Sequence, residues 1–197
     1  MADGPAPWLD VVSERGGRLI ADAASASSSV VDGGSLLVIP LRDNGLLPPI
    51  ARLTPVQATA LLLLGGEPAR ASRADVLLRS LEGAGAMIYA IKQGLVGGPA
   101  DRRGATEVSA DLVATVLDAE AGGEVEWERD PDFGYEVAAP VPGLSNDESL
   151  AMMPRLLYAR HGRVYEHASL VAEAKRRRRQ AFAATDGLDE AIAGALD

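Results

Sequence analysis

Four helix-start signals, separated by short apolar runs, constrain the fold of this chain more than any other feature. Each signal places a Ser or Thr just before a segment with helical patterning, and these residues are Thr54, Ser72, Ser109 and Ser145. In Thr54-Pro55-Val56-Gln57 the threonine caps a helix, the proline suits its first position, and the glutamine can bond back to the cap. Ser145 and Glu148 form a second capping box.

The apolar runs between these helix-start signals predict strands, so that predicted strands and helices alternate along the chain. We predict strands at 36–39, 87–91, 125–127 and 135–137, with a loop at 93–99. We predict helices at 55–64, 73–83, 110–121, 154–158 and 164–183. This alternation predicts an α/β body over residues 33–163, in which loops at strand ends carry any ligand. Residues 1–32 are predicted to be an arm with one strand at 8–12, and residues 164–197 a basic helix and tail.

Charge and composition exclude several classes of protein. A net charge of −9 over 197 residues argues against a general nucleic-acid binder. The chain has no cysteine, so it forms no disulfide or thiolate metal site, as expected in a reducing cytoplasm. The start at Met1 lacks the pattern of a secretory signal, and the longest apolar run, Ala58 to Leu64, is too short to cross a bilayer. We therefore expect a cytoplasmic protein.

One segment has the composition of an active-site border. It runs from Glu126 to Val137 and is followed by Pro140-Val141-Pro142-Gly143. Together with earlier segments, in the same order, it resembles the C-terminal part of ATP-dependent phosphoenolpyruvate carboxykinase. The segments that carry the resemblance are Ile50 to Ala58, Gly94 to Pro99, Asp130 to Val137 with Val141 to Gly143, and Pro154 to Tyr158 with the last helix. The resemblance covers about Leu36 to Phe182 and implies a mixed sheet with flanking helices and a long C-terminal helix.

The resemblance also implies a chemistry that this chain is not equipped to perform alone. The family converts oxaloacetate and ATP to phosphoenolpyruvate, and positioning and charge neutralisation by a P-loop and metal ions supply most of the catalysis. No Gly-x-x-x-x-Gly-Lys-Ser/Thr motif occurs here, and the chain has two lysines, Lys92 and Lys175. The family's lid region is reduced to a short link near residues 66–72. We therefore expect no catalytic residues and no metal ligands.

Two functional hypotheses follow from the resemblance. The first is a non-catalytic binding or assembly subunit, in a homo-oligomer or hetero-oligomer, that needs no cofactor by itself. The alternative is one subunit of a split carboxykinase-like enzyme, completed by a P-loop chain that brings ATP and Mn²⁺ or Mg²⁺. A third possibility is a nucleotide sensor that uses only a glycine loop.

The glycine loop is the candidate ligand site. Gly97 and Gly98 allow close backbone approach, and Arg102 or Arg103 can face a phosphate or stack on adenine. The simpler interpretation is a surface loop with solvated arginines. Asp130-Pro131-Asp132-Phe133 offers carboxylates for a metal, but structural support is favoured there.

The most basic run is the candidate partner site. It consists of Lys175, Arg176, Arg177, Arg178 and Arg179. The alternative is a solvated helix face whose arginine stems cover apolar surface. The two histidines, His161 and His167, are not at the i, i+4 spacing of a helical metal pair, and Gly162 lies between them.

Overall fold

The computed structural model describes residues 36–41, 45–64, 74–92, 94–99 and 102–197. The predicted arm at 1–32, the Ser72 cap and the link at 66–72 lie outside these ranges. Within them, no helix combines the length and the apolar character that crossing a membrane requires.

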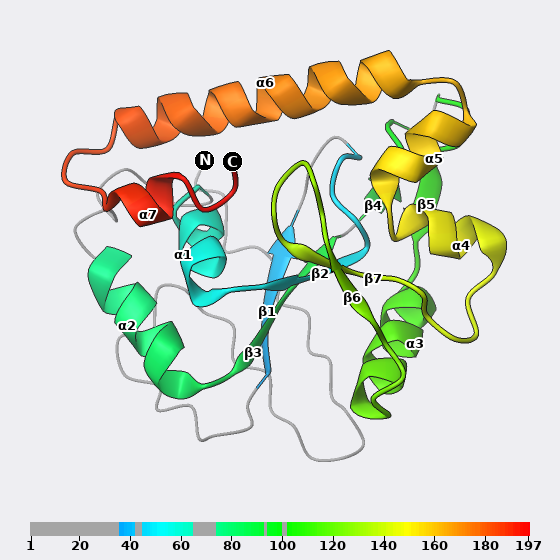
Figure 1. Ribbon diagram of the computed structural model, residues 1–197, viewed down its shortest axis with the longest axis horizontal. Helices are drawn as coiled ribbons and strands as arrows, with labels where there is room; N and C mark the ends of the chain where they lie inside the picture. The colour runs from blue at the N-terminus through cyan, green and yellow to red at the C-terminus, as the bar shows by residue number, and fades with distance from the viewer. Residues whose placement is uncertain (1–35, 42–44, 65–73, 93, 100–101) are drawn as a thin grey trace, which may run out of the picture.

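A five-stranded mixed sheet forms the centre of the fold (Figure 1), with strand order β1-β3-β2-β7-β6. Its strands are β1 (Leu36–Leu41), β2 (Ile50–Leu53), β3 (Met87–Lys92), β6 (Trp127–Arg129) and β7 (Glu136–Ala138). Only β1 and β3 run parallel, and the other three pairs are antiparallel. A separate antiparallel ribbon pairs β4 (Gly94–Val96) with β5 (Thr106–Val108). The α/β prediction is confirmed.

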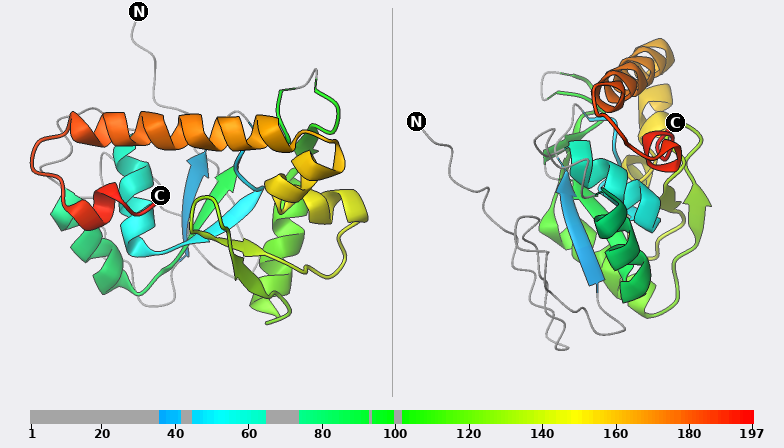
Figure 2. Two further views of the ribbon diagram at one scale, coloured as in Figure 1. Left: turned by 45° about the horizontal axis from the view of Figure 1, so that its top comes forward. Right: turned by 90° about the vertical axis from the view of Figure 1, so that its left-hand side faces the viewer.

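Seven helices surround the two sheets among the described residues. They are α1 (Pro55–Leu64), α2 (Ala74–Ala84), α3 (Ala110–Ala121), α4 (Asn146–Ala151), α5 (Pro154–Arg160), α6 (Val164–Ala183) and α7 (Glu190–Ala193). The long helix α6 runs across one side of the molecule, from α5 at one end to α7 at the other (Figures 1 and 2).

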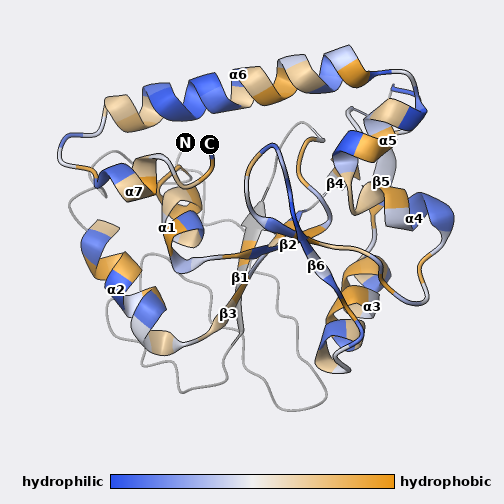
Figure 3. Ribbon diagram, viewed as in Figure 1, coloured by the Kyte–Doolittle hydropathy of each residue, from blue (hydrophilic) through white to orange (hydrophobic). Residues whose placement is uncertain are grey.

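The period-two alternation of β3 divides the core between the two faces of the sheet. Ile88 and Ala90 join one cluster, which α1, α2 and α6 cover, whereas Tyr89 and Ile91 join another, which α3 covers. A third cluster joins the far end of α6, through Phe182, to α1 and α7. Coloured by hydropathy, α6 alternates along its length and is most hydrophilic over its basic run (Figure 3). The helix therefore closes two separate parts of the core.

Local signals predicted several elements well. The Thr54 backbone N–H donates to Gln57 Oε1 at 3.0 Å, and the Gln57 N–H donates to Thr54 Oγ1 at 3.2 Å. Ser109 caps α3, and Ser145 and Glu148 form the full capping box of α4. The bounds predicted for the last long helix, 164–183, match those of α6.

Two local predictions were wrong. The segment at 94–96, expected to be loop, is strand β4, because residues 106–108 supply a pairing partner that no local pattern reveals. The strand expected at 125–127 lies instead at Trp127–Arg129, because these are the residues that pair with Glu136–Ala138 through their backbone groups.

Candidate functional site

The segment that follows β1 and the turn that follows β4 meet at a junction of glycines. The Gly97 backbone N–H donates to the carbonyl of Gly45 at 3.0 Å. Gly45 has a φ of +91°, and a Cβ there would fall on the backbone nitrogen of Gly98. Only glycine lets the two loops approach this closely.

The other side of the glycine junction packs against α5 and the start of α6. A Cβ on Gly97 would lie 2.7 Å from the Gly104 carbonyl oxygen, and one on Gly98 would lie 2.8 Å from Nη2 of Arg163. A Cβ on Gly104 would fall on the His161 ring. Other groups of this chain thus fill the space beside each of these glycines where a side chain would otherwise lie.

Arg163, the residue just before α6, ties these parts together. Its Nη1 donates to the carbonyls of Gly97 at 2.7 Å and Arg103 at 3.1 Å. Its guanidinium carbon lies 4.6 Å from the centre of the Tyr158 ring. Nε and Nη2 donate to the two carboxylate oxygens of Glu166, at 2.8 and 2.7 Å. This bidentate pairing is the main cause of the raised pKa of Arg163 and of the lowered pKa of Glu166.

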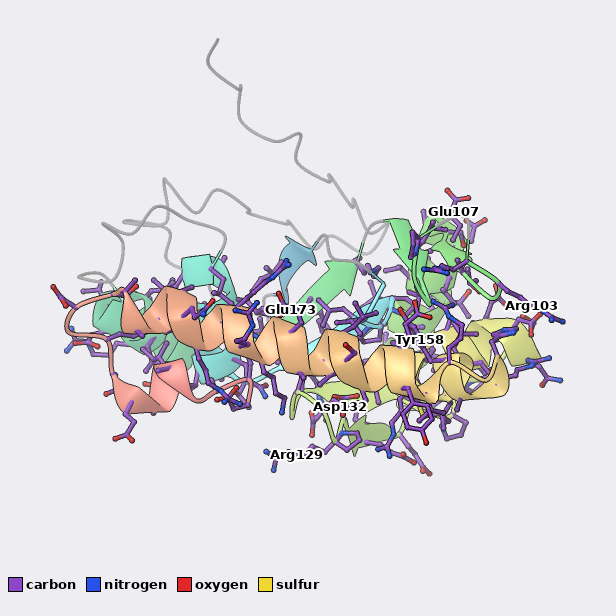
Figure 4. All side chains as sticks on the ribbon, turned by 90° about the horizontal axis from the view of Figure 1, so that it is seen from above. Arg103, Glu107, Arg129, Asp132, Tyr158 and Glu173 are labelled. Atoms are coloured by element: carbon purple, nitrogen blue, oxygen red, sulfur yellow. The ribbon has the colours of Figure 1, made fainter. Side chains whose placement is uncertain are left out.

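The predicted ligand residues take different places at this junction. Gly97 and Gly98 are buried, whereas Arg102 and Arg103 are exposed. The Nε of Arg102 lies 3.9 Å from a carboxylate oxygen of Glu166. Arg103 points outward at the edge of the molecule, while Tyr158 lies beside α6 (Figure 4). Of the two predicted arginines, Arg102 is therefore the one whose side chain approaches the Arg163–Glu166 pair.

Lys92 is the last residue of β3 and lies close to the same junction. Its backbone N–H donates to the Pro49 carbonyl at 2.9 Å, and its side chain is fully buried. Burial lowers the pKa of its ammonium group to about 8. The pKa of Lys92 is therefore closer to neutral pH than that of an exposed lysine.

A second polar group lies where α6 covers the loop between β6 and β7. Oδ1 of Asp130 accepts the backbone N–H groups of Asp132 and Phe133, at 3.0 and 2.7 Å. His167 Nε2 lies 3.9 Å from Asp132 Oδ2, and the His167 and Tyr158 rings are 5.0 Å apart. Burial raises the pKa of Asp130 and lowers that of His167. These contacts hold the loop against the helix.

The strand preceding that loop is fixed from the opposite face of the sheet. The Trp127 indole donates to Glu120 at 2.8 Å, and the Tyr89 hydroxyl donates to the same carboxylate at 3.1 Å. Arg52 lies 4.8 Å from the centre of the Trp127 ring. Strand β6 and the loop after it are thus held from both faces of the sheet.

The basic run on α6 makes several contacts within the chain. Arg176 and Arg177 both pair with Glu173, at 2.7 and 2.6 Å, and Arg179 pairs with Asp197 at 3.1 Å. Arg178 behaves differently, because its guanidinium lies 4.5 Å from the centre of the Phe133 ring and its Nη1 donates to the Leu196 carbonyl at 2.9 Å.

We searched the part of the chain that the structure describes for clusters of side chains that could bind a metal ion. No group of three or more His, Asp or Glu side chains there is arranged to hold an ion.

Sequence reasoning missed the residues that organise the glycine junction. Tyr158, Arg163 and Glu166 lie about sixty residues after Gly97, so no local motif connects them. The one sequence signal was the pairing of Arg163 with Glu166 at i, i+3, a spacing that favours ion pairs on a helix.

Comparison with known proteins shows a distant relationship. No protein-family model matches the chain. "Phosphoenolpyruvate carboxykinase (ATP)" of Paracoccus denitrificans (strain Pd 1222) is 28% identical to it over 154 residues. The match covers 62% of this chain, and the chain spans only 29% of that protein's length. The chain is therefore a distant and partial relative of ATP-dependent phosphoenolpyruvate carboxykinase.

Proposed function

We propose that this chain is a carboxykinase-related binding or assembly subunit that performs no phosphoryl transfer by itself. The observation that carries the proposal is the packing of the glycine loop. The space where a side chain would lie on Gly97 or Gly98 is filled by Leu157, Arg163 and Tyr158 of the same chain. A loop filled in this way serves to hold α5 and α6 against the sheet.

The sequence supports the same proposal. The 197 residues contain no Gly-x-x-x-x-Gly-Lys-Ser/Thr motif, and phosphoryl transfer depends on such groups to neutralise charge. The similarity to the Paracoccus carboxykinase extends over 29% of that protein. Groups that neutralise charge during phosphoryl transfer would therefore have to be supplied from outside these 197 residues.

Exposed apolar side chains support a role in assembly. Leu156 on α5 and Val164 and Tyr165 at the start of α6 are large, apolar and exposed, and Tyr165 retains 91% of its accessible surface. These three residues belong to consecutive helices, and Val76 and Met87 are exposed elsewhere. Exposed apolar side chains can mark a contact with another chain.

Two measurements on the purified chain test the proposal. With oxaloacetate, ATP and Mn²⁺, we expect no phosphoenolpyruvate above the rate without protein. In sedimentation over roughly a hundredfold range of concentration we expect self-association, or a complex with a partner captured by cross-linking from native extract. Turnover by the chain alone would refute the proposal. So would a monomer at every concentration that gains no cross-linked partner.

A second candidate is a subunit of a split carboxykinase-like enzyme. The observation that favours it is Lys92, a buried lysine at the end of a parallel strand whose pKa of about 8 suits proton exchange. Its test is to mix the chain with a P-loop carboxykinase-like chain from the same source and assay the mixture. Turnover that requires both chains and is lost in Lys92→Met would select this candidate over the first.

A further inference from the structure

The surroundings of Arg163 hold more hydrogen-bond donors than acceptors. Arg163 and Arg102 are both donor-only side chains that approach the Glu166 carboxylate. The Tyr158 hydroxyl is buried beside them, and its proton has no acceptor among the described residues. A guanidinium cannot accept its proton. A buried donor without an acceptor is costly, so its presence calls for an explanation.

Arg163 does not depend on Glu166 for its position. Its Nη1 is fixed by the Gly97 and Arg103 carbonyls, and its plane lies over the Tyr158 ring. Its Nε and Nη2 form the edge that Glu166 occupies. Were Glu166 to turn away, that edge would remain in place and aimed at the same point. Such preorganised donors favour binding because little order is lost when a ligand arrives.

Glu166 itself is suited to leave. Its carboxylate sits on a flexible stem in the first turn of α6, and its side chain keeps 34% of its accessible surface, against 13% for Arg163. Solvent and solutes can therefore reach the carboxylate side of the pair. The two parallel bonds that it receives are those that a guanidinium offers to any carboxylate or phosphate.

We propose that Arg163, Arg102 and Tyr158 form a binding site for the oxyanion of a small ligand, a phosphate or carboxylate group, whose place the Glu166 carboxylate takes in this structure. A phosphate group has a further oxygen with which to accept the Tyr158 proton after two have paired with Arg163. The site goes beyond the assembly role proposed above and does not rest on it, because binding and turnover are measured separately.

Removal of the internal carboxylate tests the site. Isothermal titration at low ionic strength would compare the intact chain with Glu166→Ala, using inorganic phosphate, ATP and malonate as probes. We expect Glu166→Ala to bind at least one probe about tenfold more tightly, since the ligand no longer competes with an attached carboxylate. Tighter binding of phosphate and ATP assigns a phosphate ligand, and tighter binding of malonate alone assigns a carboxylate.

Glu173→Ala is the matched control. Glu173 lies on the same helix and also pairs with two arginines, Arg176 and Arg177, but its partners are exposed. We expect this variant to bind the probes as the intact chain does. If Glu166→Ala binds none of the probes more tightly than Glu173→Ala, the proposal is wrong.

Double variants show whether any gain in affinity for the probes arises at the proposed site. In Glu166→Ala, adding Arg163→Lys removes the bidentate edge while keeping the charge, and we expect it to abolish the gain. Adding Tyr158→Phe instead should weaken phosphate several-fold and leave malonate less affected. Circular dichroism melts would verify that each variant is folded. A gain that survives Arg163→Lys would place the binding elsewhere and overturn the assignment.

Discussion

The Nε2 atom of His167 lies 3.9 Å from Oδ2 of Asp132, and the His167 side chain is buried between α6 and the loop that joins β6 to β7. Desolvation has the largest effect on His167 and lowers its pKa below 6.5. Asp132 and Asp130 partly oppose this by raising the pKa, and Arg155 lowers it. At neutral pH the imidazole is therefore uncharged and the pair is not an ion pair.

The first prediction concerns stability at mildly acidic pH. Because folding lowers the pKa of His167, the unfolded chain takes up a proton at a higher pH than the folded chain does. Stability is consequently lost as the pH falls through 6.5 toward the lower, folded value. Urea unfolding at about pH 7.5 and about pH 5.5 should show this loss, and His167→Gln should reduce it. An equal loss in the variant and the intact chain would contradict the assignment.

The second prediction concerns Lys92 on the alkaline side. Its pKa is lowered from 10.5 to about 8 by burial, so the unfolded chain holds its proton at a pH where the folded chain has lost it. Stability should rise by about 1–3 kcal/mol between about pH 7 and pH 9.5. Urea unfolding of Lys92→Met should show a flatter profile, and the same slope in both proteins would disprove the link.

The third prediction separates close packing from backbone conformation at two glycines. Gly45 and Gly162 both have positive φ, but a Cβ on Gly45 would fall on the Gly98 backbone whereas one on Gly162 meets nothing within 4 Å. Gly162→Ala should cost about 1–2 kcal/mol, the ordinary cost of the left-handed conformation. Gly45→Ala should cost about 4 kcal/mol or prevent folding. Equal losses in thermal melts would show that the two loops do not meet as described.

The fourth prediction divides the basic run on α6. Arg178→Ala should destabilise the protein by about 1–2 kcal/mol, because it removes the contact with Phe133 and the bond to the Leu196 carbonyl. Arg177→Ala is the control, since its pairing with Glu173 is exposed and should contribute little to stability. Denaturant titrations of both variants give the comparison. Similar losses would mean that Arg178 is solvated like its neighbours.

The sequence predicted what short-range chemistry determines. The cap at Thr54, the Ser145–Glu148 box and the length of α6 depend on residues within a few positions of one another. The pairing of β2 between β3 and β7 depends on segments far apart in the chain, so the alternating pattern predicted the α/β class but not the mostly antiparallel order. The helix α7 was also missed, although Asp189 provides a cap.

The candidate site divides in the same way. Gly97, Gly98 and Arg102 were predicted from one short stretch, and the structure brings them to the junction. Arg163 and Glu166 were not predicted to act there, because their role arises only once α5 and α6 fold back over the loop. The nucleotide interpretation of that loop, like the partner interpretation of the basic run, stays a prediction.

The path of α6 across two clusters sets the order in which the protein can be completed during synthesis. Val171 joins the cluster against the sheet, and Phe182 joins the one with α1 and α7. A ribosome delivers both residues after every strand of the sheet has been made. The apolar sides of α1 and β3 therefore stay exposed to solvent until α6 has been synthesised. A nascent chain stalled before residue 164 should accordingly bind chaperones strongly.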